Sequence, residues 1–300
     1  MARPDKDSNR AFYDSEREDD RVRFDEHPSK VFQAELLVPW IASALPPGSV
    51  VLDIAGGSGV YASKIVRAAP VSVIGLDLSE SMVRQRAADP LLQLNVVGDM
   101  EALPFASEAF DAVMFVGCLH HVPDPLISLR EATRVLRPGG LLFAAEPVSL
   151  RAGGDAAEPV PGHPHEFRFS RRFLLARMRR AGLRIDDVTG KRLTIRLLSL
   201  AVRSPGVGLF RKGDAVDRAL AAVGLGRFGE IALVRASRPG GAATTPGGAR
   251  PAEPARLLAC PHCHGPLGEG PAGLGCGGCG ATYPVVGGLP VLLSAAPSSE

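Results

Sequence analysis

Hydrophobic and polar positions along this chain repeat with two different periods, and their alternation predicts an α/β protein. Amphipathic segments typical of helices separate short apolar runs typical of strands. The predicted strands cover 50–54, 71–76, 92–97, 109–116 and 141–145. The predicted helices cover 31–45, 61–69, 79–88 and 125–136, the third with Ser79 as N-cap. Alternation at this spacing favours βαβ units and a doubly wound, mostly parallel Rossmann-like sheet with helices on both faces.

The second half of the chain completes a predicted sheet of seven strands and then changes character. Further helices are expected at 171–181 and 214–223, and further strands at 184–188 and 231–236. The stretch 238–256 is rich in Gly, Pro, Ala and Thr, which is typical of a flexible linker. We therefore expect a helical lid segment over 1–45, a main domain over 46–237, the linker over 238–256 and a small separate domain over 257–296.

The composition of the chain limits which partners and which cellular compartment are expected. The 34 basic and 32 acidic residues nearly balance, so no global field favours a nucleic acid or a membrane surface. The polar N-terminus lacks the apolar core of a signal peptide, and no apolar run reaches membrane-spanning length. Four of the five cysteines form two CxxC pairs, which suits metal binding in a reducing compartment better than disulfides. Together these features favour a cytoplasmic protein.

A glycine-rich turn follows the first strand and is the first candidate binding site. The run Val50–Gly59 reads VVLDIAGGSG, in which glycines allow a ligand to approach the backbone closely. Asp77 ends the next strand, where a carboxylate can bind both ribose hydroxyls, and Asp99 ends the third. A nicotinamide dinucleotide and S-adenosylmethionine both fit such a site. The spacing departs from the dinucleotide pattern G-x-G-x-x-G, and Asp53 before the loop suits an ammonium group, which favours S-adenosylmethionine.

Residues 50–147 resemble the type-11 class I methyltransferases, which use S-adenosylmethionine. The matching segments are VLDIAGGSG, IGLDLSESM, GDMEALPFASEAFD, HHVPDP and ATRVLRPGGLLFAAEP. Alanine before two glycines is similar to the ubiquinone and menaquinone C-methyltransferases, but the HHVPDP segment departs from that subgroup, so the quinone substrate is not carried over. The resemblance implies these cofactor contacts: Ala55, Gly57 and Gly59 around the methionine moiety, Asp77 on the ribose, Leu78 and Met82 in the same segment, Asp99 and Met100 on the adenine, and Gly117 on the sulfonium side.

Three residues near the expected site could perform acid–base chemistry. His120 and His121 follow the fourth strand and could serve as base or as substrate contacts, and Glu146 ends the fifth strand beside the same crevice. Structural roles compete with these, because the histidines could pack or cap the turn and Glu146 could cap the following loop. Tyr13 could close over the cofactor as a lid residue, or serve only as an aromatic anchor. Cys118 is better explained as a small buried residue than as a nucleophile.

Two further polar segments bear on the acceptor. The proline-marked segment 161–168 is typical of a lid loop. Its His163, His165 and Glu166 could bind a metal or act as a base, although a solvated loop explains them more simply. The stretch 168–196 holds ten basic residues and could bind a phosphate, an acidic carrier protein or RNA. A solvated arginine-rich helix face is favoured, because no aromatic residues are interleaved to stack on bases.

The cysteines near the C-terminus have the spacing of a zinc ribbon. Cys260 and Cys263 form one pair, and Cys276 and Cys279 form the other; four thiolates close a tetrahedral shell, which is the structural arrangement of zinc. A unit of about 40 residues is too small for a sufficient core, so metal would supply most of its folding energy. The segment 257–293 resembles the small zinc-binding activator subunit of tRNA, rRNA and release-factor methyltransferases. This resemblance implies that the ribbon docks on the methyltransferase domain in cis and stabilises it.

Three functions are compatible with these patterns. The leading one is S-adenosylmethionine-dependent methyl transfer, by in-line displacement, to a small-molecule acceptor in specialised metabolism. A methyltransferase acting on RNA or protein is the alternative, which the ribbon and the basic stretch suggest. Against it, the chain carries VGCL after the fourth strand instead of an NPPY-type tetrapeptide. The third is a regulatory protein that binds S-adenosylmethionine without transfer. The oligomeric state stays open.

Overall fold

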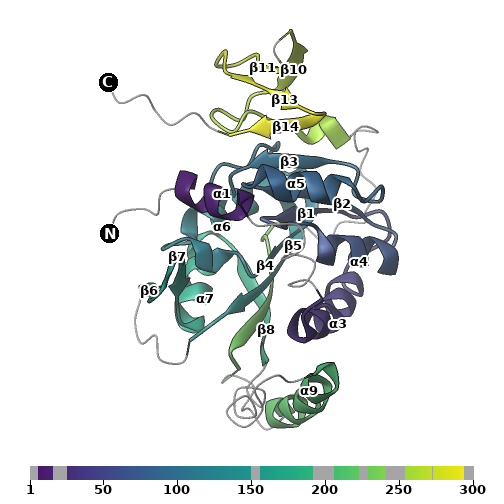
Figure 1. The fold of residues 1–300 in the computed structure, drawn as a ribbon, viewed down its shortest axis with the longest axis vertical. Coiled ribbons are helices and arrows are strands. Elements are labelled where there is room, and N and C mark those ends of the chain that lie inside the picture. Colours follow the sequence, from purple (N-terminus) through teal and green to yellow (C-terminus); the bar gives the residue numbers. More distant parts are fainter. Residues whose placement is uncertain are drawn as a thin grey trace.

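The computed structural model describes residues 6–15, 26–149, 156–191, 206–222, 229–240, 254–271 and 273–293. A nine-stranded sheet crosses this part of the chain, with helices on both of its faces (Figure 1). Its strands follow the order β13-β14-β3-β2-β1-β4-β5-β9-β8. The predicted Rossmann-like α/β class is therefore confirmed.

Seven of these strands are the ones that the sequence predicts. They are β1 (Val50–Ile54), β2 (Ser72–Asp77), β3 (Asn95–Gly98), β4 (Phe110–Val116), β5 (Leu136–Pro147), β8 (Arg184–Lys191) and β9 (Ile231–Ser237). β3, β2, β1, β4 and β5 are parallel, and β9 runs antiparallel between β5 and β8. Parallel strands align their carboxyl ends, so the loops after β1, β2, β3 and β4 meet at one edge of the sheet.

The third strand is shorter than predicted, because the chain turns before it. The Leu92 N–H donates to the carbonyl of Asp89 at 3.0 Å, and the side-chain amide of Asn95 donates to the carbonyl of Leu92 at 2.7 Å. Leu92 is buried, which explains its apolar character outside a strand. β5 in turn begins at Leu136, before its predicted start at 141, since Leu136 pairs with Phe110 across a bulge.

Helices cover the two faces of the sheet in separate sets. They are α3 (Pro28–Ala42), α4 (Val60–Ala68), α5 (Glu80–Ala87), α6 (Leu126–Val135), α7 (Arg171–Arg180) and α9 (Val207–Ala222). α3 and α4 bury Ile41 and Ile65 in one cluster, whereas α6 and α7 bury Leu129 and Phe173 in another. Each such side chain stabilises the fold by roughly 1.5–3 kcal/mol. The two apolar clusters pack against the sheet and fix the positions of its strand ends.

The cysteine module continues the central sheet. Its strands are β10 (Leu267–Gly270), β11 (Gly273–Cys276), β12 (Thr282–Tyr283), β13 (Val285–Val286) and β14 (Leu289–Leu292), after the short turn η3 (Pro254–Leu257). β14 pairs in parallel with β3, and Leu258 pairs with Phe105 in an isolated bridge. Leu258, Tyr283 and Leu292 belong to the same core cluster as the sheet. The module thus extends the sheet through β14 and contributes side chains to the same apolar core.

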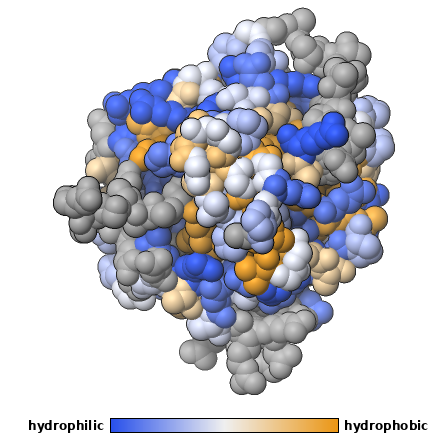
Figure 2. All heavy atoms as spheres, turned by 90° about the horizontal axis from the view of Figure 1, so that it is seen from above, coloured by the Kyte–Doolittle hydropathy of each residue, from blue (hydrophilic) through white to orange (hydrophobic). Residues whose placement is uncertain are grey.

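The end of the molecule that carries this module has a mixed surface. Figure 2 looks onto it and shows hydrophobic side chains in small groups between hydrophilic ones. Val285 and Val286 on the outermost strand, β13, are 44% and 40% exposed. Gly287 and Gly288 close the β13–β14 hairpin with φ of 58° and 81°, a two-residue turn for which glycine is favoured.

Two segments that the sequence assigns to lids fold into regular structure. α1 (Lys6–Asp14) lies against α5, where the Asp14 carboxylate accepts from the Ser79 hydroxyl at 2.7 Å. β6 (Glu158–Val160) and β7 (His163–Arg168) form a hairpin where a polar loop was predicted. Residues 16–25, 192–196 and 241–253, which belong to the predicted lid, basic stretch and linker, lie outside the described residues. Within the described part, no helix combines the length and the apolar character needed to span a membrane.

Candidate functional site

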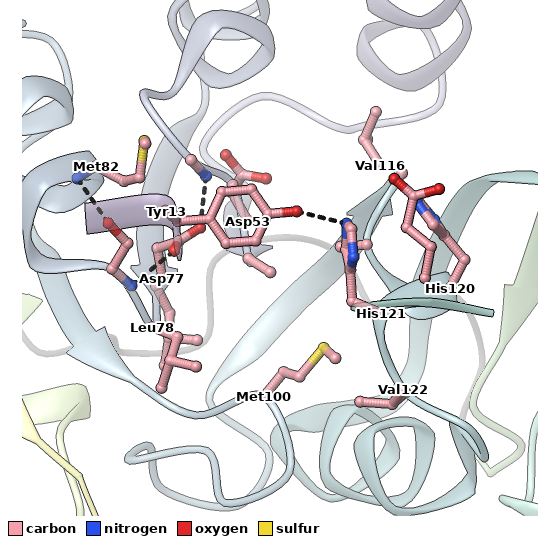
Figure 3. Close-up of a pocket in the computed structure, with 18 of the residues that line it drawn as sticks. Tyr13, Asp53, Asp77, Leu78, Met82, Met100, Val116, His120, His121 and Val122 are labelled. Atoms are coloured by element: carbon pink, nitrogen blue, oxygen red, sulfur yellow. Dashed lines mark hydrogen bonds between the residues drawn. The ribbon is translucent and has the colours of Figure 1, made fainter. Parts of the chain in front are cut away.

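A cavity of about 940 Å³ lies at the carboxyl ends of β1, β2 and β4. This volume is near the upper end of the usual range for ligand sites, roughly 300–1,000 Å³. Most of the predicted cofactor residues line it: Tyr13, Asp53, Ala55, Gly57, Asp77, Leu78, Met82, Asp99, Met100 and Gly117. His120 and His121 line its other side (Figure 3), whereas Gly59 and Glu146 do not reach it. The cavity can accommodate a nucleoside cofactor and a second molecule together.

The glycine loop between β1 and α4 is held against the end of β2. The Gly57 N–H donates to Oδ2 of Asp77 at 2.8 Å, and the Ser79 N–H donates to Oδ1 at 3.0 Å. Ala55, Gly57 and Gly59 adopt φ of 51°, 54° and 81°. This left-handed region is easy for glycine but costs an L residue about 1–2 kcal/mol, so Ala55 is strained. Asp77 keeps lone pairs for ribose hydroxyls, because a carboxylate has about four acceptor sites.

Asp53, which we expected to face an ammonium group, is instead paired inside the protein. Its Oδ2 accepts from Nη1 of Arg86 at 2.6 Å, and its side chain is 4% exposed. Burial raises the pKa of Asp53, and the Arg86 guanidinium opposes that rise. The guanidinium of Arg86, on α5, therefore neutralises the charge of Asp53. In the sequence, the one local sign of Arg86 is Gly75, because a glycine inside a buried strand often marks a close approach by another group.

The expected adenine end of the cavity is closed by α1. Lys6 forms an ion pair with Asp99 and a second one with Glu101 at 2.7 Å. Asp99 also accepts from the Glu101 N–H at 2.8 Å, which rigidifies the turn after β3. Lys6 was not singled out in the sequence, because its partner lies 93 residues away. The N-terminal segment thus touches the predicted adenine contact, as a lid would.

His120 and Glu146 form a pair on the opposite side of the cavity. Glu146 is fully buried on β5, and its Oε1 accepts from the N–H groups of Cys118 at 2.9 Å and Leu119 at 3.0 Å. Its Oε2 lies 3.0 Å from Nδ1 of His120. A carboxylate only accepts, so Nδ1 carries the proton and Nε2 is left to accept one. Glu146 does not line the cavity; its contacts hold His120 and the turn η1 (Leu119–His121) in place.

His121 is committed to two protein partners. Its Nδ1 lies 2.9 Å from the carbonyl of His165, which can only accept, so Nδ1 donates. Its Nε2 therefore accepts from the Tyr13 hydroxyl at 3.2 Å (Figure 3). Burial and the neighbouring His120 lower the pKa of His121, which keeps it neutral near pH 7. Both ring nitrogens of His121 thus have protein partners, whereas His120 contacts Glu146 through Nδ1.

The structure does not favour a reactive thiolate at Cys118 or a metal site built from the histidines of β7. Burial raises the pKa of the Cys118 thiol well above its ordinary value, so a thiolate is disfavoured. Its Sγ donates to the carbonyl of Ile54 at 3.5 Å. Within the described ranges, His163, His165 and Glu166 do not converge as a metal-binding group. His165 contributes its carbonyl to the site, and Glu166 lines the cavity.

The four cysteines of the C-terminal module converge on one point. Their sulfur atoms all lie within 4.8 Å of one another, with Cys260 and Cys279 at 3.7 Å and Cys263 and Cys276 at 3.4 Å. A tetrahedral zinc ion with Zn–S bonds of about 2.3 Å requires sulfur–sulfur separations of about 3.8 Å. The N–H of Gly278 donates to Sγ of Cys276 at 3.4 Å. Backbone N–H groups lower the pKa of Cys276 to about 6, which favours the thiolate that a metal needs. The donor set therefore fits a structural zinc ion.

A glycine loop, the Asp77 carboxylate and the His120–Glu146 pair lie together at the carboxyl edge of a doubly wound sheet. In comparison with known families, residues 52–144 match the methyltransferase domain family, type 11. The matched stretch includes the glycine loop, Asp77 and His120. The match ends before the cysteine module, so the four-cysteine cluster lies outside it.

Two curated methyltransferases are similar to part of this chain. The ubiquinone/menaquinone biosynthesis C-methyltransferase of Cereibacter sphaeroides is 39% identical over 119 residues, 37% of this chain and 47% of that protein. The 27-O-demethylrifamycin SV methyltransferase of Amycolatopsis mediterranei is 34% identical over 135 residues, 40% and 49% of the two chains. The chain spans about half the length of the curated relatives it matches.

Solved structures support the fold over a longer stretch. A chain from the complex between the Haloferax volcanii Trm112 methyltransferase activator and a methyltransferase matches with a TM-score of 0.54 and 22% identity, covering 80% of this chain and 100% of that chain. A geranyl diphosphate methyltransferase matches with a TM-score of 0.53 and 20% identity, covering 70% and 79%. At these identities the likeness concerns the fold alone.

Proposed function

We propose that this chain transfers a methyl group from S-adenosylmethionine to a hydroxyl group of a small-molecule acceptor. The observation that carries the proposal is the His120–Glu146 pair, which leaves one imidazole nitrogen to accept a proton beside a cavity of about 940 Å³. Support for the cofactor comes from the methyltransferase domain over residues 52–144 and from the loop that Asp77 holds. S-adenosylmethionine supplies a methyl group already activated on a sulfonium.

In this mechanism the protein contributes alignment and one proton transfer. Holding two reactants in line can lower the barrier by roughly 7–11 kcal/mol. Nε2 of His120 takes the proton of the acceptor hydroxyl as the new carbon–oxygen bond forms and the carbon–sulfur bond breaks. Glu146 stabilises the imidazolium through Nδ1, at 3.0 Å, and holds the ring in the required tautomer. The proton then passes to water.

The acceptor side of the cavity suits an apolar molecule with few polar groups. Phe12, Ile127, Pro147 and Ile231 line the cavity together with His120. Apolar walls with a small number of placed polar groups are the usual form of a small-molecule site. Similarity to a 27-O-demethylrifamycin SV methyltransferase supports an acceptor from specialised metabolism.

We further propose that Cys260, Cys263, Cys276 and Cys279 hold one structural zinc ion. Four sulfur ligands complete the tetrahedral shell, so the ion has no open position for chemistry. Its role is to hold the knuckle that precedes β14, the strand that borders β3. Zinc thereby stabilises the methyltransferase domain without taking part in transfer.

The test measures binding and acceptor choice separately. Calorimetry with S-adenosylmethionine, followed by release of S-adenosylhomocysteine with a panel of hydroxylated aromatic and aliphatic molecules, should reveal binding and turnover of small acceptors. Bulk tRNA and ribosomal RNA serve as competing acceptors. Methylation of RNA alone would replace this proposal by an RNA-modifying function, and binding without any turnover would favour a regulatory protein.

A further inference from the structure

An arginine lies buried beneath the glycine loop. Arg86, on α5, is 1% exposed, although arginine is rarely buried unless paired. Its Nη1 donates to Asp53 at 2.6 Å and its Nε donates to the side-chain oxygen of Asn95 at 2.7 Å. One side chain therefore joins the ends of β1 and β3 across the strand between them, β2.

Glycines make the room for this arrangement. A Cβ added at Gly75 would lie 1.9 Å from Nε of Arg86, and one added at Gly59 would lie 2.9 Å from its Cγ. A Cβ added at Gly56 would lie 2.2 Å from Oδ2 of Asp53. Two loop glycines and a strand glycine thus accommodate the ion pair, in addition to any role in admitting a ligand.

Folding alone does not explain this pair. A buried ion pair loses much of its attraction to desolvation, and packed apolar side chains of similar volume often stabilise a core as well or better. Among the described residues, Nη2 of Arg86 is also buried without a hydrogen-bond partner, which adds to the cost. Asp53, in contrast, lines the cavity where the cofactor is expected. The pair therefore points toward the site.

We propose that Arg86 is a positioning residue of the cofactor site, because its guanidinium holds the Asp53 carboxylate in place directly against Gly56. This inference rests on the proposed function. Asp53 supports the loop from below while Asp77 holds Gly57 from the side at 2.8 Å. The glycine loop therefore already has its binding conformation before the cofactor arrives. Binding then loses little conformational entropy in the loop.

The arginine also governs how the site responds to pH. Burial raises the pKa of Asp53, and Arg86 is the group that opposes this rise. The other titratable groups near Asp53 are Asp77, at the end of β2, and the Cys118 thiol, whose pKa is raised well above its ordinary value. Without the guanidinium, the Asp53 carboxyl takes up a proton more readily. Cofactor affinity then changes with pH in a way that the native pair suppresses.

Substitutions at Arg86 and Asp53 test this inference by calorimetry with S-adenosylhomocysteine between pH 6 and 9. Arg86→Met should weaken binding by about tenfold or more, which is the usual contribution of a charge-assisted hydrogen bond. It should also make the affinity depend on pH. Arg86→Lys keeps the charge but not the planar fork, so it should bind more weakly than the native protein with a flat pH profile. Asp53→Asn combined with Arg86→Met should also lose the pH dependence.

Arg137→Met is the matched control. Arg137 forms an ion pair with the buried Asp111, whose carboxylate binds the N–H of Val50 at the far end of β1. If Arg86→Met and Arg86→Lys both bind as tightly as Arg137→Met, with flat pH profiles, the positioning role is wrong. If the native protein does not bind S-adenosylhomocysteine, the proposed function fails first, and the two failures are thereby told apart.

Discussion

Replacing Glu146 by glutamine isolates its effect on the tautomer of His120. The two side chains have the same size, and the amide oxygen can still accept from the N–H groups of Cys118 and Leu119, at 2.9 and 3.0 Å in the native protein. The amide nitrogen then faces Nδ1 of His120, at 3.0 Å in the native protein, and donates to it. Nδ1 must become the acceptor, so the proton moves to Nε2. Because Nε2 then already carries a proton, it can no longer take one from the hydroxyl group of the methyl acceptor.

The size of the effect follows from these contacts. A positioned base contributes about 10²–10⁴-fold to the rate, so kcat of Glu146→Gln should fall within this range. Weaker hydrogen bonds to a neutral amide should lower the free energy of unfolding by about 1–3 kcal/mol. Affinity for S-adenosylmethionine should stay within about twofold, because Glu146 is fully buried and does not line the cavity.

Three measurements check this prediction. Release of S-adenosylhomocysteine with the small acceptor found in the panel gives kcat, and calorimetry gives cofactor affinity. Nitrogen-15 NMR of labelled histidine reports the tautomer directly, with a proton on Nδ1 in the native protein and on Nε2 in the variant. Glu108→Gln is the control, since Glu108 is 51% exposed and paired with Arg238. A kcat within threefold of native, or an unchanged tautomer, would refute the assignment of His120 as base.

Four other predictions follow from individual contacts. Asp77→Asn should weaken S-adenosylmethionine binding by about tenfold to a hundredfold in calorimetry, because it weakens the bond to Gly57 and the ribose contact. Tyr13→Phe should lower kcat/KM by about two- to tenfold with little change in Tm, since the hydroxyl bond to His121 is lost while the ring stays in place. Because the pKa of His121 is lowered in the folded protein, urea unfolding should show stability falling below about pH 6.5, with a smaller slope in His121→Gln. Elemental analysis should find one zinc per chain, and Cys276→Ser should lose it and lower Tm, whereas Cys118→Ser should retain it.

Local patterns in the sequence determined most of the main fold. Apolar runs and amphipathic segments depend on neighbours within a turn or a strand, so β1, α4 and α6 match their predicted bounds within a residue or so. The glycine loop, Asp77 and the two CxxC pairs are also local, because spacing along the chain defines each of them. A parallel sheet then brings the strand ends together, which explains why most of the predicted cofactor residues line one cavity.

Contacts between distant segments were decided only by the tertiary structure. Lys6 meets Asp99 across 93 positions, Tyr13 meets His121 across 108, and Arg86 meets Asp53 across 33. The hydrophobic periodicity of the sequence does not predict such pairs, because each pair depends on how two elements are placed in space. Tertiary placement also gave Asp53 and Glu146 their protein partners, Arg86 and His120. The join of β14 to β3 is of the same kind: spacing predicts the cysteine knuckles, but an unpaired strand edge determines where they dock.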